Sequence, residues 1–293
     1  RFDRSFPVTI VRRAVHPYRA FGDFLALARE PSLEFVISNT TEAGIVLDPS
    51  DRFSDEPPRS FPGKLTRLLW ERYRFVGGDP SRGLTVFPTE LIEHNGEALR
   101  RCVLELAGLW GLDKAFLRWV SESCRFCPTL VDRIVSGCAK EELPALWERL
   151  GERDELVTVG EPFGMWAIEA PADVAARFPV DGEGSAAFFV SDLAPWKQRK
   201  VRILNGGHTA LTPAAYLAGQ ELVRCCMEDA LLRGYLERAE REELVPFVPL
   251  PRAESEAFAR DVLERFSNPF LDHRLLDIAA NSMLKWRERV LPS

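Results

Sequence analysis

The sequence predicts an α/β protein in which a parallel sheet is followed by a region made only of helices. Up to about residue 190, short apolar runs alternate with amphipathic helical patterns. The long helical crossover between the first runs favours parallel pairing. From Pro195 onward, helical patterns follow one another with no strand between them. We therefore expect a sheet domain over residues 1–190 and an all-helical domain over residues 191–293.

Individual elements follow from hydrophobic periodicity and from the residues that interrupt it. Strands are expected where apolar and β-branched residues run together, at 8–15, 33–38, 84–88, 163–169 and 186–190. Helices are expected where apolar residues recur every three or four positions, at 21–29, 63–75, 97–108, 112–122, 141–150, 195–218, 221–243, 253–266 and 272–288. A short helical turn is expected at 172–178.

Composition limits the class of function. The 293 residues carry a formal net charge of −6 and no dense block of Lys and Arg, which argues against nucleic-acid binding. No apolar run reaches the roughly 18 residues that a membrane span needs, and no secretory signal opens the sequence. Cys124 and Cys127 form a lone C-x-x-C without the second pair that a structural zinc site needs. We expect reduced thiols, no metal and a cytoplasmic location.

Two polar loops are expected at the carboxyl ends of neighbouring strands. The first spans residues 39–44 and the second spans residues 89–96. Open α/β sheets place their ligands at this edge. An ordinary polar turn explains the first loop equally well from the sequence alone.

A third candidate region runs from Lys200 to His208. On an α-helix, Asn205 lies about 140° and His208 about 80° from Lys200, at roughly 100° per residue. An amine, an amide and an imidazole then share one broad face, which suits the reduction of a carbonyl group. Gly206 and Gly207 each cost about 1 kcal/mol relative to Ala in a helix, so we expect something to pack closely against their backbone. A solvated helix face would carry the same residue types.

One acidic residue lies inside an apolar run. Asp132 stands among β-branched residues, next to Arg133. A carboxylate in such a run is expensive to bury unless it is paired. The alternative is a local pair of Asp132 with Arg133 at the surface.

These segments together resemble one known family. Lys200-x4-Asn205-x2-His208 resembles the catalytic signature of the polyol-specific long-chain dehydrogenases, the mannitol dehydrogenase family. Four further blocks resemble this family in the same order, namely Thr41-Glu42-x-Gly44, Asn95-Gly96, Val131-Asp132-Arg133-Ile134 and Glu161-Pro162-Phe163. Five ordered blocks are far more specific than any single motif. The similarity covers nearly the whole chain from about residue 18 and is greatest to the branch that acts on hexuronates.

The resemblance implies a Rossmann-like fold and an NAD-dependent interconversion of D-tagaturonate and D-altronate. Lys200 would be the general acid in reduction and the base in oxidation. Asn205 and Asn95 would hold the developing alkoxide, and His208 would orient the substrate oxygen or the lysine. No metal is implied, because the ammonium group replaces a Lewis acid.

The resemblance also implies contacts to a sugar-acid substrate and to the cofactor. Asp132 would accept hydrogen bonds from substrate hydroxyls. Arg133 and Lys285 are candidates to face the substrate carboxylate, and Lys197 is a weaker one. The residues on the nicotinamide side would be Asn39, Thr41 and Glu42.

The sequence departs from the family in two respects. No glycine-rich phosphate-binding turn precedes residue 33, and relatives continue with more helix beyond residue 293, so we expect a chain truncated at both ends with an incomplete cofactor site. The resemblance implies that mannitol-acting relatives carry an acidic residue at the position of Lys197. They tend to carry a substrate-binding Arg at the position of Asp277. Fructuronate reduction, a mannitol-type activity and a catalytically silent member remain alternatives, and oligomeric state stays open.

Overall fold

The computed structural model describes residues 7–135, 138, 140–178, 180 and 185–291; of Glu42 it describes the backbone only. These residues fall into two compact units. We call Arg1–Thr129 with Ala170–Arg177 the N-unit, and Leu130–Glu169 with Phe178–Ser293 the C-unit. Residues 130–169 thus group with the helices, and the domain boundary near residue 190 stays a prediction.

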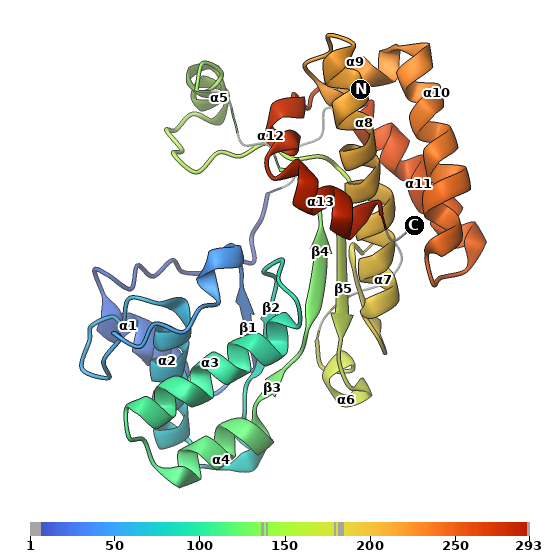
Figure 1. Ribbon diagram of the computed structural model, residues 1–293. Coiled ribbons are helices and arrows are strands. Elements are labelled where there is room, and N and C mark those ends of the chain that lie inside the picture. Colours follow the sequence, from blue (N-terminus) through green and yellow to red (C-terminus); the bar gives the residue numbers. More distant parts are fainter. Residues whose placement is uncertain (1–6, 136–137, 139, 179, 181–184, 292–293) are drawn as a thin grey trace. The chain divides into compact units, whose positions relative to one another are not determined.

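The N-unit contains a parallel three-stranded sheet with helices packed against it (Figure 1). Its elements are α1 (Phe21–Ala26), η1 (Leu27–Arg29), β1 (Phe35–Ser38), η2 (Glu42–Gly44), α2 (Phe61–Phe75), η3 (Pro80–Arg82), β2 (Thr85–Pro88), α3 (Asn95–Leu109), α4 (Lys114–Ser123), β3 (Arg125–Phe126) and α6 (Ala172–Ala175). The strand order is β1-β2-β3, and β2 pairs in parallel with both neighbours. The expected parallel pairing is confirmed.

Local sequence explains how the central elements of the N-unit form. All four residues of β2 are buried, as a continuous apolar run in the middle of a parallel sheet requires. The Ser60 hydroxyl accepts a hydrogen bond from the Gly63 backbone N–H at 2.9 Å and so caps the start of α2. Leu65 and Leu69, one turn apart, then point into the core shared with α3 and α4.

The C-unit contains a second three-stranded sheet, in the order β4-β5-β6, and a group of helices. Its elements are β4 (Thr129–Asp132, whose first residue belongs to the N-unit), α5 (Leu143–Leu150), β5 (Met165–Glu169), β6 (Ala187–Val190), α7 (Ala194–Arg199), the π-helical turn η4 (Lys200–Asn205), α8 (Gly206–Leu217), α9 (Val223–Glu228), α10 (Ala230–Ala239), the π-helical turn η5 (Glu240–Leu244), η6 (Val245–Phe247), α11 (Arg252–Phe266), α12 (Leu275–Ala279) and α13 (Ser282–Arg289). β5 and β6 pair in parallel, and the expected α/β class with a helical C-terminal region is confirmed.

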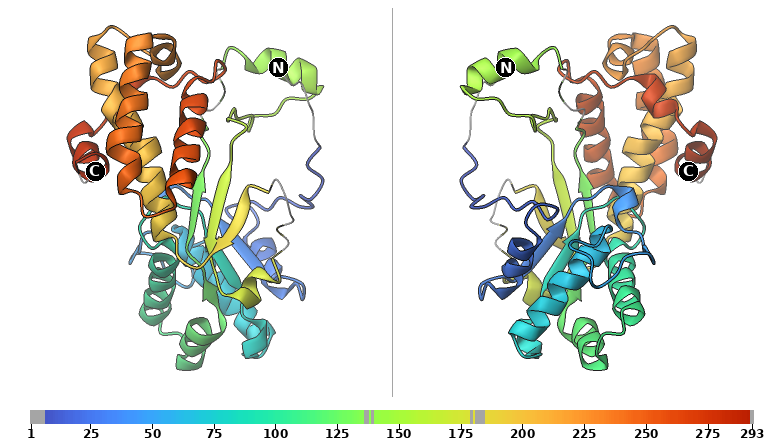
Figure 2. Two further views of the ribbon diagram at one scale, coloured as in Figure 1. Left: turned by 90° about the vertical axis from the view of Figure 1, so that its right-hand side faces the viewer. Right: turned by 90° about the vertical axis from the view of Figure 1, so that its left-hand side faces the viewer.

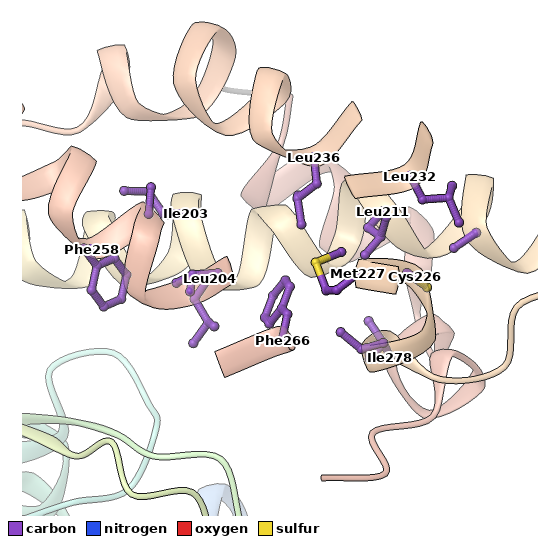
Figure 3. Packing of buried hydrophobic residues seen from close by; sticks show 14 of the residues in the cluster. Ile203, Leu204, Leu211, Cys226, Met227, Leu232, Leu236, Phe258, Phe266 and Ile278 are labelled. Atoms are coloured by element: carbon purple, nitrogen blue, oxygen red, sulfur yellow. The ribbon is translucent and has the colours of Figure 1, made fainter. Parts of the chain in front are cut away.

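The helices of the C-unit enclose one apolar core. Figure 2 shows α10 and α11 alongside the long helical segment formed by α7, η4 and α8. Ile203, Leu204 and Leu211 of that segment are buried among side chains that include Leu236 and Phe266 (Figure 3). The residues between Lys200 and His208 therefore belong to a packed helix rather than to a solvated one.

Three expected elements differ in the structure, and one strand, β3, was not expected. Residues 8–15 form no strand, and Val8, Ile10 and Val11 are exposed. The helix expected at 221–243 is interrupted at Asp229, whose side chain caps the start of α10 by accepting hydrogen bonds from two backbone N–H groups. The helix expected at 272–288 is divided into α12 and α13 by Asn281, which has a left-handed backbone. The two-residue β3 is too short to have left a periodic signal.

Three observations bear on the class of protein. In the ranges that the structure describes, none of the helices is both long and apolar enough to cross a bilayer. Within the same ranges, His, Cys, Asp and Glu side chains form no group of three or more that could hold a metal ion. None of the six cysteines forms a disulfide.

Candidate active site

A buried carboxylate organises the loop that follows β1. Glu90, which is 2 % exposed, accepts hydrogen bonds from the Ser38 hydroxyl at 2.9 Å and from the backbone N–H and the hydroxyl of Thr40, both at 2.8 Å. Hydrogen bonds to an ionised acceptor are stronger than neutral ones. The end of β1 is therefore held to the segment that follows β2, at the carboxyl edge of the sheet.

The loop held by Glu90 has a strained backbone. Thr41 has φ 71° and ψ 168°, a region that costs a β-branched residue on the order of 1–3 kcal/mol. At Gly44, an added Cβ would lie 1.9 Å from the Thr40 hydroxyl oxygen, so the turn excludes a side chain. Strain of this kind clusters where a ligand is held. Asn39 and Thr41 are exposed on this loop, and their contacts with a cofactor stay predictions, as does that of Glu42, whose side chain is outside the described part.

Asn95 joins three backbone segments. Its side-chain N–H group donates to the carbonyls of Pro88 (3.0 Å), Glu90 (3.0 Å) and Thr129 (2.9 Å), and its oxygen accepts from the Thr129 N–H at 3.1 Å. A Cβ at Gly96 would lie 2.7 Å from the Phe126 carbonyl, so the start of α3 touches the chain directly after β3. Because an amide has only two N–H hydrogens, donation from Asn95 to an alkoxide would require one of these bonds to open. That role stays a prediction.

Lys200 begins the π-helical turn η4. The residue is buried, with 8 % exposure, and its amine donates to the carbonyl of Val131 on β4 at 2.7 Å. The backbone hydrogen bonds of a π-helix join residues five apart, which brings Lys200 and Asn205 onto the same face. The separation of about 140° expected for an α-helix is therefore wrong for this pair. Single π-helical turns inside α-helices are frequent at functional sites.

The two glycines after Asn205 allow close packing, as expected. A Cβ at Gly206 would lie 3.2 Å from the Arg289 carbonyl of α13. A Cβ at Gly207 would lie 3.0 Å from a carboxylate oxygen of Glu240. Because neither glycine has a side chain, α13 and η5 can pack directly against the backbone that carries the candidate residues.

His208 is a buried, neutral imidazole. Its ring stacks on Phe266 at 4.0 Å between centroids, and the ring of His273 meets it edge-on at 4.9 Å. Burial lowers the pKa of His208 well below its ordinary value, and the nearby His273 and Arg265 lower it further. Its Nε2 is buried and has no hydrogen-bond partner among the described residues. An orphaned ring nitrogen of this kind is available to a substrate oxygen.

Lys285 and Arg133 occupy different settings. The Lys285 amine on α13 donates to the Ile278 carbonyl at 2.8 Å, and burial and the neighbouring Arg289 lower its pKa. The exposed Arg133 donates to the Phe163 carbonyl at 2.8 Å. Facing a substrate carboxylate stays a prediction for both residues. Lys285 is close enough to lower the pKa of His208, whereas Arg133 is not among the groups that do so.

Asp132 is paired with a residue that the sequence did not suggest. Both of its oxygens accept hydrogen bonds from the Arg265 guanidinium, at 2.9 and 3.0 Å, and Arg265 also binds Glu161. Burial opposes the charge on Arg265, but these hydrogen bonds raise its pKa above the ordinary value. The alternative of a surface pair with Arg133 is wrong, because Asp132 is buried. Binding of substrate hydroxyls by Asp132 stays a prediction, and its oxygens are already engaged by Arg265.

Two family models match the chain in succession. Residues 4–182 match the mannitol dehydrogenase Rossmann domain, and residues 192–293 match the mannitol dehydrogenase C-terminal domain. The altronate oxidoreductase of Yersinia enterocolitica is 46 % identical over 282 residues, which is 96 % of this chain and 58 % of that protein. The altronate oxidoreductase of Phocaeicola vulgatus is 45 % identical over 97 % of this chain and 60 % of its own length. The chain thus spans somewhat more than half the length of these relatives.

Solved structures of two related enzymes have the same fold. Substrate-free D-sorbitol dehydrogenase superposes with a TM-score of 0.74 at 26 % identity, over 90 % of this chain and 56 % of that one. The mannitol 2-dehydrogenase of Pseudomonas fluorescens, in a ternary complex with NAD and D-mannitol, superposes with a TM-score of 0.65 at 23 % identity, over 89 % of this chain and 54 % of that one. With both family models matched in order, the chain belongs to the mannitol dehydrogenase family.

Proposed function

We propose that the protein is an NAD-dependent oxidoreductase that interconverts D-tagaturonate and D-altronate. The choice of substrate is supported by similarity to altronate oxidoreductases over 96–97 % of the chain. The choice of cofactor is supported by the family and by the fold shared with a dehydrogenase that binds NAD. A cytoplasmic location accords with such an activity on a small sugar acid and is part of the same proposal.

The observation that carries the proposal is the setting of Lys200. A buried amine on a π-helical turn, held at 2.7 Å from a backbone carbonyl, is fixed in direction. In the reductive direction its ammonium group donates a proton to the keto oxygen, and in oxidation the neutral amine accepts the proton from the hydroxyl. Asn205, on the same face, donates an amide N–H to the oxygen as negative charge develops, and the orphaned Nε2 of His208 orients it.

The loop after β1 fits the nicotinamide side of the cofactor. Its backbone is strained at Thr41 and leaves no room for a side chain at Gly44. Glu90 holds it at the carboxyl edge of a parallel sheet. Asn39, Thr41 and Glu42 would hold the cofactor there. When bound, the dinucleotide supplies the hydride, and the residues of the chain orient the substrate and move the proton.

The proposal is tested by turnover of the purified full-length protein. NADH oxidation is followed with D-tagaturonate, D-fructuronate and D-fructose, and D-tagaturonate is expected to give the highest kcat/KM. Lys200→Ala should lower kcat with D-tagaturonate by about 10²- to 10⁴-fold, the range for loss of a general acid. The exposed Lys114→Ala is the control and should retain the full rate. Preferred turnover of D-fructose would refute the substrate, and an unimpaired Lys200→Ala would refute the role of the lysine.

A further inference from the structure

A buried ionic cluster joins α11 to the sheet of the C-unit. The side chains of Arg265, Asp132 and Glu161 are 5 %, 3 % and 1 % exposed. Nη1 and Nη2 of Arg265 bind the two oxygens of Asp132 at 3.0 and 2.9 Å. Nε and Nη2 bind Glu161, at 3.0 Å to Oε2 and 2.8 Å to Oε1. We call these three residues the Arg265 clamp.

The clamp holds the backbone on both sides of the Lys200 acceptor. Lys200 donates to the carbonyl of Val131, and that carbonyl shares a rigid peptide plane with the N–H of Asp132. Two residues further along, the Ile134 N–H donates to the Glu161 carboxylate at 2.6 Å. The direction of the Val131 carbonyl is therefore set by two acidic side chains that a single guanidinium holds together.

Stability alone is a weak reason for such a cluster. Burying three charges costs several kcal/mol per ion before pairing, and apolar side chains of similar volume often stabilise a core as well or better. What a forked guanidinium provides is a fixed geometry, because its donors match two carboxylates in a planar arrangement. The face of the guanidinium also lies over the Phe163 ring at 4.1 Å, which restricts its rotation.

We propose that Arg265 is a positioning residue for Lys200, acting through Asp132 and Glu161 to direct the Val131 carbonyl that holds the lysine amine. This rests on the proposed function, in which Lys200 transfers the proton. In this arrangement the carboxylate of Asp132 binds Arg265 rather than the substrate, and the carboxylate of Glu161 is the second group that binds Arg265. Proton transfer demands placement of the amine to within a fraction of an ångström, and an error of about 1 Å can cost on the order of 10²-fold in rate.

The first test replaces the guanidinium of Arg265 without removing its positive charge. Arg265→Lys keeps a cation but loses the fork, so kcat with D-tagaturonate should fall by about 10- to 100-fold while KM changes much less. A hydrogen bond to the charged form favours that form. Loss of the carbonyl acceptor should therefore move the limb of the kcat–pH profile that reports Lys200 to lower pH.

The matched control is another buried arginine. Arg72, in the N-unit, donates to the carbonyls of Ala28, Glu30 and Leu33. Arg72→Lys should lower the melting temperature but leave the pH profile of kcat in place. If Arg265→Lys folds and has the wild-type pH profile and kcat, the proposal is overturned.

A second measurement does not depend on turnover. Acetylation of individual lysines by a water-soluble amine reagent is followed by mass spectrometry in the wild type, Arg265→Lys and Glu161→Gln. Lys200 should be acetylated faster in both variants, and Lys285, which is held by Ile278 on another element, serves as the internal reference. Unchanged labelling of Lys200 in the variant that folds would refute the clamp. Absence of D-tagaturonate turnover in the wild type would refute the proposed function instead, and labelling would still decide the role of Arg265.

Discussion

Two of the side chains in or against α8 leave buried polar atoms without a partner in the part of the chain that the structure describes. One is His208, through Nε2, and the other is Glu240, through both carboxylate oxygens. An unsatisfied buried polar group costs about 1–3 kcal/mol and calls for an explanation. For His208 the explanation proposed above is the substrate. At Glu240, burial and the nearby Glu237 raise the pKa to about 8, so protonation removes the buried charge.

Glu240 should make stability depend on pH. Its pKa rises from an ordinary value of 4.5 to about 8 on folding, so the folded state binds the proton more tightly than the unfolded state does. The contribution is complete below pH 4.5 and is lost progressively up to pH 8, at about 1 kcal/mol per pH unit. Glu240→Gln should therefore gain more stability over the wild type at pH 8 than at pH 5. Urea unfolding at both pH values measures this, and an equal difference at the two would contradict it.

The helical segment from α7 to α8 shows how packing between elements restricts sequence. It contains the π-helical turn η4, and the turn η5 packs against it. The carboxyl group of Glu240 lies close to α8 at Gly207, where an added Cβ would be 3.0 Å from one of its oxygens. Closely packed interiors accommodate added volume poorly, so the interface depends on the absence of a side chain at this position.

Replacement of glycine by alanine should have opposite effects at two helical positions of the C-unit. At Gly234, in α10, an added Cβ would meet nothing within 4 Å. Gly234→Ala should therefore raise the free energy of unfolding by about 0.5–1 kcal/mol through helix propensity alone. At Gly207 the Cβ would meet Glu240 at 3.0 Å and Leu236 at 3.4 Å. Gly207→Ala should lower the free energy of unfolding. If it raised the free energy of unfolding as much as Gly234→Ala does, η5 would have to move away from the added methyl group, and the prediction would be wrong.

Across the molecule, the candidate residues are divided between the two units. The N-unit carries the loop with Thr41 and Gly44, and the C-unit carries Lys200 with His208. Under the proposed function, the first unit contacts the nicotinamide side of the cofactor and the second handles the proton. Cofactor binding and proton transfer should then be separable by single substitutions.

Titration of the full-length protein with NADH, followed by nicotinamide fluorescence, tests this division. Gly44→Ala should raise the Kd for NADH by at least about tenfold, which corresponds to 1.4 kcal/mol, because the Cβ would collide with Thr40. Lys200→Ala should bind NADH with the wild-type Kd. Gly108→Ala, whose Cβ would meet nothing within 4 Å, is the control in the N-unit. Equal affinity of Gly44→Ala and the control would remove the loop from the cofactor site.

The sequence by itself determined the α/β class, the parallel pairing of β1 with β2 and most of the helices, because apolar periodicity is a local signal. It also placed Lys200, Asn205 and His208 on one helical segment, since nine consecutive residues are enough to define a face. It indicated close packing at Gly206 and Gly207 from helix propensity alone. The apolar run at residues 8–15 led to a wrong prediction, because these residues form no strand in the structure.

Only the tertiary structure decided which distant groups meet. Asp132 could be recognised as a carboxylate that needs a partner, but its partner Arg265 lies 133 residues further along the chain. The π-helical turn that aligns Lys200 with Asn205 is likewise invisible in the pattern of side chains, because it depends on what packs around the helix. Hydrophobic periodicity predicts the secondary structure of each segment, whereas the tertiary fold determines which buried charges are paired, because it brings distant segments together.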